Sequence, residues 1–330
     1  MQLATEIVRF FHIDVATTPN STVRTIEDFT RSQPGWYEAL DMGEVFRICS
    51  ALEKEGYLVS VLPDSRHPVL GRAFIALNFE ERRATYGEYE FAAHGFYRVR
   101  EHFQNSIMPV VVEKQDGSPD VGTCFLVGNH HTVVTARHVI KDASKIEIRG
   151  TNGEPVNLRS LIVPRNENLD VAILSINRDA MIKLPFLRFD APVVLDEVLC
   201  MGYPPIPGFD ELQINEIASI NTTLKTSRGR IVAEAEAYIE RQEYLLINAR
   251  VKGGNSGGPI INKKGYAVGI LVSVPLDPHD TTHIDELGYG IAVPKQAFIP
   301  LLGTVAGPSP LVTALPFTNL AGGGFSTLSR

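Results

Sequence analysis

Three short stretches of the chain carry residue types that act together in nucleophilic catalysis. His138 comes two residues after the run TVVTA, and Asp170 directly precedes the apolar run VAIL. Ser256 lies inside the glycine-rich stretch GGNSGGP at 253–259. A serine hydroxyl becomes an effective nucleophile when a neighbouring base takes its proton and a third group orients that base. The first two patterns are weak alone and the third is specific, so we expect the three side chains to form one site.

These stretches resemble the corresponding segments of trypsin-like serine peptidases, and GNSGGP is similar to the HtrA-type branch in particular. The resemblance covers residues 106–300, and the order His, Asp, Ser is that of the chymotrypsin-type fold. It implies that Ser256 attacks a peptide carbonyl, that His138 transfers the proton, and that Asp170 orients the imidazole. It also implies that the main-chain N–H groups of Gly254 and Ser256 form an oxyanion hole.

The same resemblance places the base of the specificity pocket six residues before the nucleophile. Arg250 occupies that position, in INARVKGGNSGG. A cation there would favour cleavage after aspartate or glutamate through a charge-assisted pair. The alternative is that the long Arg250 side chain turns outward to solvent.

The region that carries these motifs is typical of an all-β fold. From Ile107 onward, short apolar runs alternate with turn signals, which predicts many short strands. Together with the resemblance, this predicts a double-barrel trypsin-like protease domain over residues 106–303. Residues 304–330 are rich in glycine, proline, serine and threonine, and we expect a flexible C-terminal tail there.

The N-terminal third of the chain has a different pattern. Helical spacing of apolar residues is found at 3–12, 24–32 and 41–55, and apolar strand-like runs follow at 57–62 and 73–79. Three helices followed by a hairpin resemble a winged-helix domain, over residues 1–80. Residues 81–105 are predicted to form a connecting helix. The expected fold is therefore a multi-domain α+β chain, with a winged-helix-like domain followed by an all-β protease domain.

The charge of the N-terminal third bears on what it binds. Residues 1–105 carry 11 lysines and arginines against 15 aspartates and glutamates, and the helix at 41–55 carries two against four. Duplex DNA binding draws much of its affinity from basic residues that neutralise phosphates. We therefore favour a regulatory protein partner or ligand at this domain. A winged-helix DNA-binding regulator with an associated protease domain is the disfavoured alternative.

The composition and the cysteines bear on the compartment. The net charge is −7 and 44% of the residues are hydrophobic, which is ordinary for a globular protein. Cys49, Cys124 and Cys200 are too few and odd in number for a disulfide framework. Charged residues interrupt the N-terminal apolar stretch, and no run reaches bilayer-spanning length. We expect a cytoplasmic chain that acts on protein substrates, with no membrane attachment, no metal and no cofactor.

The entry into the protease region bears on activation. Trypsin-type zymogens need a cut before an Ile-Val-Gly-Gly-like start, by the family resemblance, and the segment QNSIMPVVVEK lacks one. The HtrA-type likeness implies instead that mobile loops gate the site. We expect the loops at 203–213, 252–256 and 275–288 to move when a partner or ligand acts through the N-terminal domain.

Overall fold

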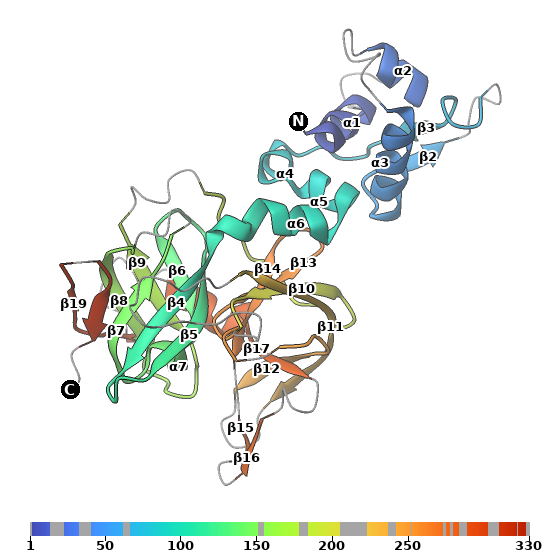
Figure 1. The fold of residues 1–330 in the computed structure, drawn as a ribbon. Coiled ribbons are helices and arrows are strands. Elements are labelled where there is room, and N and C mark those ends of the chain that lie inside the picture. The colour runs from blue at the N-terminus through green and yellow to red at the C-terminus, as the bar shows by residue number, and fades with distance from the viewer. Residues whose placement is uncertain are drawn as a thin grey trace. The chain divides into compact units, whose positions relative to one another are not determined.

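The computed structural model describes most of the chain. The described residues are 2–13, 23–32, 41–61, 67–150, 155–177, 184–204, 223–236, 242–251, 253–272, 275–277, 280–283, 289–302, 310–321 and 323–327. Internal contacts divide the chain into two units, each described by itself below (Figure 1). The first unit is Met1–Val99 with Lys263–Gly265, and the second is Arg100–Asn262 with Tyr266–Arg330.

The first unit combines helices with a small antiparallel sheet. Its first elements are α1 (Leu3–Phe11), β1 (Arg24–Thr25), α2 (Ile26–Arg31), α3 (Met42–Lys54), β2 (Val59–Val61) and β3 (Ala73–Ile75). The sheet order is β1-β3-β2, so the predicted hairpin gains a third strand at one edge. Phe11, Phe29, Ile48 and Phe74 are buried in the core between the helices and this sheet. The helical periodicity of the sequence thus identified the faces that pack.

The predicted connecting helix at 81–105 is instead three short helices. They are α4 (Glu81–Tyr86), α5 (Glu88–His94) and α6 (Phe96–Phe103), followed by the 3-10 turn η1 (Gln104–Ser106). The breaks fall at Gly87 and Gly95, whose φ angles are 92° and 67°. A residue in this left-handed region cannot continue a right-handed helix, and glycine adopts it at little cost.

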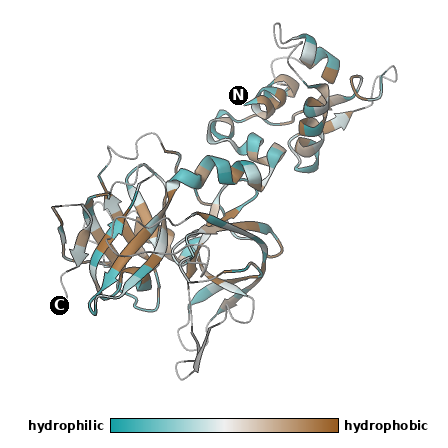
Figure 2. Ribbon diagram, viewed as in Figure 1, coloured by the Kyte–Doolittle hydropathy of each residue, from teal (hydrophilic) through white to brown (hydrophobic). Residues whose placement is uncertain are grey.

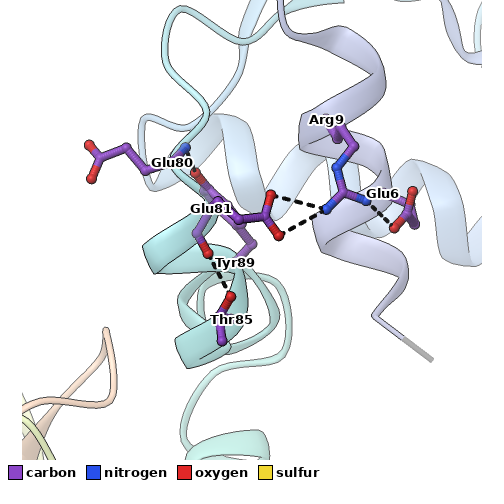
Figure 3. Close-up of polar contacts among 6 residues, drawn as sticks. All are labelled: Glu6, Arg9, Glu80, Glu81, Thr85 and Tyr89. Atoms are coloured by element: carbon purple, nitrogen blue, oxygen red, sulfur yellow. Dashed lines mark hydrogen bonds and ion pairs between the residues drawn. The ribbon is translucent and has the colours of Figure 1, made fainter.

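Two of these helices belong to the packing of the first unit rather than to a linker. Figure 3 shows the Arg9 guanidinium of α1 between Glu6 and Glu81, at 2.6 Å and 3.5 Å. The buried Glu90 carboxylate accepts the main-chain N–H of Thr5 at 3.0 Å, which caps the first turn of α1. The unit therefore extends beyond the predicted boundary at residue 80.

The second unit begins with a nine-stranded antiparallel sheet. Six of its strands precede residue 180: β4 (Ile107–Lys114), β5 (Pro119–Leu126), β6 (Thr132–Thr135), β7 (Ala143–Ile148), β8 (Leu158–Pro164) and β9 (Ala172–Ile176), with α7 (Arg137–Ile140) after β6. Their order is β8-β9-β6-β5-β4-β7. Much of the hydrophobic colour of Figure 2 follows these strands, and β6 and β9 are buried along their whole length.

The remaining long strands close into a six-stranded barrel. They are β10 (Glu197–Gly202), β11 (Lys225–Glu236), β12 (Glu243–Ile247), β13 (Pro259–Asn262), β14 (Ala267–Val272) and β17 (Gly290–Pro294), in the order β10-β11-β12-β17-β14-β13. Val198, Ile231, Ile260 and Leu271 are in its core. Between β14 and β17, β15 (Pro275–Asp277) and β16 (Asp280–His283) form a two-stranded sheet. α8 (Lys295–Leu302) follows the barrel.

The second unit therefore consists of one closed barrel and one open sheet curled into a half-barrel, which is consistent with the predicted double barrel. The C-terminal segment belongs to the open sheet. The predicted flexible tail at 304–330 contains β18 (Val312–Ala314), β19 (Phe317–Asn319) and β20 (Phe325–Thr327). β18 pairs with β8 and β20 pairs with β7, so these strands extend the sheet at both ends. The amino-acid composition of this segment suggested a tail, because composition alone does not show that a residue such as Phe325 is buried and holds a strand in place.

Within the described ranges, no helix combines the length and the apolar character that crossing a membrane requires.

Candidate active site

His138 and Asp170 meet because their strands are neighbours. His138 lies in α7, three residues after the end of β6, and Asp170 lies two residues before the start of β9. β6 and β9 are antiparallel, with Thr135 opposite Ala172, which brings the end of one strand beside the start of the other. Asp170 then contacts His138 twice: Oδ1 accepts the main-chain N–H at 2.8 Å, and Oδ2 lies 2.5 Å from ring Nδ1.

This two-point contact has a chemical consequence for the imidazole. A carboxylate accepts hydrogen bonds, so the proton of a neutral ring is held on Nδ1. Nε2 of His138 is then the nitrogen with a lone pair available to take a proton. The arrangement is that of an oriented general base.

Ser256 lies on the loop between β12 and β13. It is 8% exposed, and Gly257 and Gly258 follow it into β13. The Gly257 N–H donates to the Leu271 carbonyl at 2.7 Å, and the Gly258 N–H donates to the Asn255 carbonyl at 2.8 Å. These bonds join the serine loop to the barrel and give it a fixed turn.

The Ser256 loop is also bonded to the open sheet. The main-chain N–H of Thr123, on β5, donates to the Ser256 carbonyl at 2.9 Å. β5 pairs with β6, the strand that leads to His138. One sheet therefore positions all three predicted residues: His138 and Asp170 in direct contact, and Ser256 through its main chain.

The N–H groups of Gly254 and Ser256 are suited to hold a negatively charged oxygen. In the part of the chain that the structure describes, neither group donates to a protein acceptor. Gly254 has a φ of 87°, a conformation that residues with a Cβ rarely adopt. Main-chain donors of this kind, left unpaired in a fixed loop, stabilise charge that develops on an oxygen atom.

Arg250 lies at the surface on the segment after β12. Its side chain is exposed, whereas Ala249 and Val251 on either side pack against the barrel core. A Cβ at Gly290, at the start of β17, would lie 2.6 Å from Cγ2 of Val251. The acidic preference predicted from Arg250 stays a prediction.

Sequence reasoning assigned no role to two residues of the site, Thr123 and Thr135, although Thr135 begins the four-residue motif that ends at His138. Both are completely buried, and the Thr135 hydroxyl donates to the Thr123 carbonyl at 2.7 Å. The available signal was a hydroxyl residue inside an apolar strand, since buried polar groups almost always have a partner. That signal does not name the partner.

The three cysteines take no part in this site. Burial raises the pKa of Cys200 to about 12, raises that of Cys49 to about 12, and raises that of Cys124 further. A thiol is reactive as the thiolate, so these side chains are inert near neutral pH. Among the described residues, no group of three or more histidine, cysteine, aspartate or glutamate side chains is placed to hold a metal ion.

Part of this chain is similar to known peptidases. A family model described as a trypsin-like peptidase domain matches residues 122–270. A probable periplasmic serine endoprotease, DegP-like, of Chlamydia trachomatis is 27% identical over 177 residues, which are 53% of this chain and 31% of that protein. The serine endoprotease DegS of Escherichia coli K12 is 28% identical over 179 residues, 53% of this chain and 45% of that protein.

A solved structure of the serine endoprotease from Yersinia pestis has a TM-score of 0.46 at 21% identity, and covers 63% of this chain and 65% of that one. The chain spans less than half the length of the two curated relatives it matches.

Proposed function

We propose that this chain, whose residues 122–270 are a trypsin-like peptidase domain homologous to the HtrA-type serine proteases, is a serine endopeptidase that cleaves protein substrates. The observation that carries the proposal is the contact of Asp170 with both the main chain and the ring of His138. That contact leaves Nε2 as the base, in a sheet that also binds the loop of Ser256.

In the proposed reaction, Ser256 Oγ attacks the carbonyl carbon of the scissile peptide, and its proton moves to Nε2 of His138. The carbonyl oxygen becomes an oxyanion, which the N–H groups of Gly254 and Ser256 stabilise. The carbon–nitrogen bond then breaks as Nε2 returns the proton to the leaving amine. Water, activated by the same nitrogen, hydrolyses the acyl ester and restores the serine.

The test is covalent labelling of Ser256 with a fluorophosphonate, alongside cleavage of an unstructured protein such as casein. We expect label on Ser256 in the wild-type chain and none in Ser256→Ala, with the same circular dichroism spectrum for both. The control is Thr327→Ala, which removes the hydroxyl of a threonine 71 residues after Ser256 and should keep the label. Label that persists in Ser256→Ala would contradict the assignment of the nucleophile.

The specificity proposal concerns Arg250, which we propose binds an acidic side chain before the cleaved bond. Its support is the position six residues before Ser256 and the exposure of the side chain. A peptide library should show aspartate or glutamate before the cut, and Arg250→Gln should remove that preference with cleavage retained. A preference for small apolar residues in the wild-type chain would refute the proposal.

The regulatory proposal is that a protein partner or ligand acts through the N-terminal unit in the cytoplasm. It is supported by the segment QNSIMPVVVEK, which lacks the Ile-Val-Gly-Gly-like start of trypsin-type zymogens. It is also supported by β4, which follows η1 directly at Ile107. We expect low basal activity, and stimulation without a change in intact mass. Activity that appears only with a clipped chain beginning near Ile107 would show zymogen cleavage instead.

The DNA-binding alternative predicts salt-dependent retardation of duplex DNA by the chain. The net negative charge of the N-terminal third opposes such binding.

A further inference from the structure

We propose that Thr123 is a positioning residue, whose hydroxyl holds the main chain of the Ser256 loop in the conformation that binds an oxyanion. The inference rests on the proposed function and adds to it a residue outside the motifs. Thr123 lies on β5 of the open sheet and is completely buried. It contacts the loop through both its main chain and its side chain.

Four hydrogen bonds converge on Thr123. Its N–H donates to the Ser256 carbonyl at 2.9 Å, and its Oγ1 donates to the Gly254 carbonyl at 2.7 Å. Oγ1 also accepts the main-chain N–H of Tyr203 at 3.0 Å. Its own carbonyl accepts the hydroxyl of Thr135 at 2.7 Å. All the polar atoms of one buried threonine are thereby used.

The direction of the hydroxyl proton follows from these partners. The Tyr203 N–H has only a proton to give, so Oγ1 must be the acceptor in that bond. The Thr123 proton is then free to point at the Gly254 carbonyl, which is only an acceptor. The orientation of the hydroxyl is therefore determined, and hydrogen bonds in such a dry interior are stronger than in water.

The two bonded carbonyls flank the groups that bind the oxyanion. The Gly254 and Ser256 carbonyls lie on either side of the peptide that carries the Ser256 N–H. The N–H of Gly254 is on the same residue as one of these carbonyls, and a glycine allows rotation about its own dihedrals at little cost. A hydrogen bond to the Gly254 carbonyl opposes that rotation, so it keeps both N–H groups directed to one point.

Thr123 also connects this loop to the strand of the base. Thr135, which bonds its carbonyl, is the last residue of β6 and lies three residues before His138. The distance between the N–H groups of the Ser256 loop and His138 therefore depends on two hydrogen bonds, which the hydroxyl groups of Thr123 and Thr135 donate. A shift of about 1 Å between such groups is enough to reduce a rate 100-fold.

The test compares Thr123→Val, which keeps the shape and loses the hydroxyl, with Thr123→Ser, which keeps the hydroxyl. We expect kcat of Thr123→Val to fall on the order of 10- to 100-fold with little change in KM, less than the loss of an oxyanion donor itself. Thr123→Ser should retain most of kcat. The matched control is Thr132→Val, at another buried threonine of the same sheet, which should leave kcat unchanged.

A second measurement does not depend on turnover. Hydrogen–deuterium exchange of peptides covering residues 253–258 should be faster in Thr123→Val than in the wild-type chain, and unchanged in Thr123→Ser and Thr132→Val. Equal kcat and equal exchange in Thr123→Val and the wild type would overturn the inference. A wild-type chain that neither cleaves casein nor labels at Ser256 would contradict the proposed function, and exchange alone would then decide the role of Thr123.

Discussion

Gly257 packs so closely against Thr123 that a Cβ atom at position 257 would lie 2.1 Å from the Thr123 carbonyl oxygen. The same atom would lie 2.3 Å from Oγ1 of Thr135. The residue after Ser256 therefore has no room for a side chain, because Thr123 and Thr135 occupy that space. Its φ of 85° adds a second requirement for glycine.

Gly257→Ala should destabilise the chain and reduce cleavage. The left-handed conformation and the overlap with Thr123 together should cost about 2–5 kcal/mol of the free energy of unfolding. Gly117→Ala is the matched control, because Gly117 has a φ of 80° and open space where a Cβ would be. It should cost only about 1–2 kcal/mol and leave activity intact. Urea denaturation of both variants makes the comparison, and equal losses would show that the close packing is unimportant.

Asp170→Asn should lower kcat on the order of 10⁴-fold with a smaller effect on KM, because an amide no longer fixes the proton on Nδ1 of His138. Steady-state kinetics on a fluorogenic peptide measures the effect. The control is Asp190→Asn, since Asp190 accepts the Ala191 N–H at 2.8 Å yet does not contact the histidine. Near-normal turnover in Asp170→Asn would exclude this carboxylate from the catalytic machinery.

Phe325→Ala should destabilise the second unit by about 3–5 kcal/mol, although it lies in a segment whose composition suggests a tail. Phe325 is completely buried on β20 and meets Phe317 edge to face, with ring centroids 6.1 Å apart. Phe317 is half-buried, so Phe317→Ala should cost less. Guanidinium denaturation ranks the two variants. A Phe325→Ala chain as stable as the wild type would mean that β20 contributes nothing to the fold.

Stability should fall as the pH rises from about 9 to about 12. Burial raises the pKa of Cys200 from 9.0 to about 12, and burial, then the Cys124 charge, raises that of Tyr203 from 10.0 to about 12. At a pH between the pKa of the unfolded chain and that of the folded chain, the folded chain binds more protons than the unfolded chain. The stabilisation present below pH 9 is therefore progressively lost as the pH rises. Denaturation midpoints measured across this range test the sign. The slope above pH 10 should be smaller in Tyr203→Phe, and an equal slope would exclude Tyr203 as a contributor.

The sequence by itself determined which residues to consider for the chemistry and which elements carry them. The motifs around His138, Asp170 and Ser256 could be singled out because each consists of a few consecutive residues. The helices of the first unit and the short strands of the second could be predicted because the 3.6-residue and two-residue periods reflect burial on one face. The helix ends at Gly87 and Gly95 also have a local cause, the backbone freedom of glycine, although the sequence analysis predicted one connecting helix over 81–105.

Only the tertiary structure decided what depends on partners far apart in the sequence. Thr123 contacts the Gly254 carbonyl across 131 residues, and no pattern near Thr123 indicates that bond. β18 and β20 are strands because the edges of β8 and β7 offer main-chain groups for them to pair with. The amino-acid composition of residues 304–330 does not indicate this pairing. A hydrogen bond to a distant edge is a property of the folded chain, whereas periodicity and glycine content are properties of a segment.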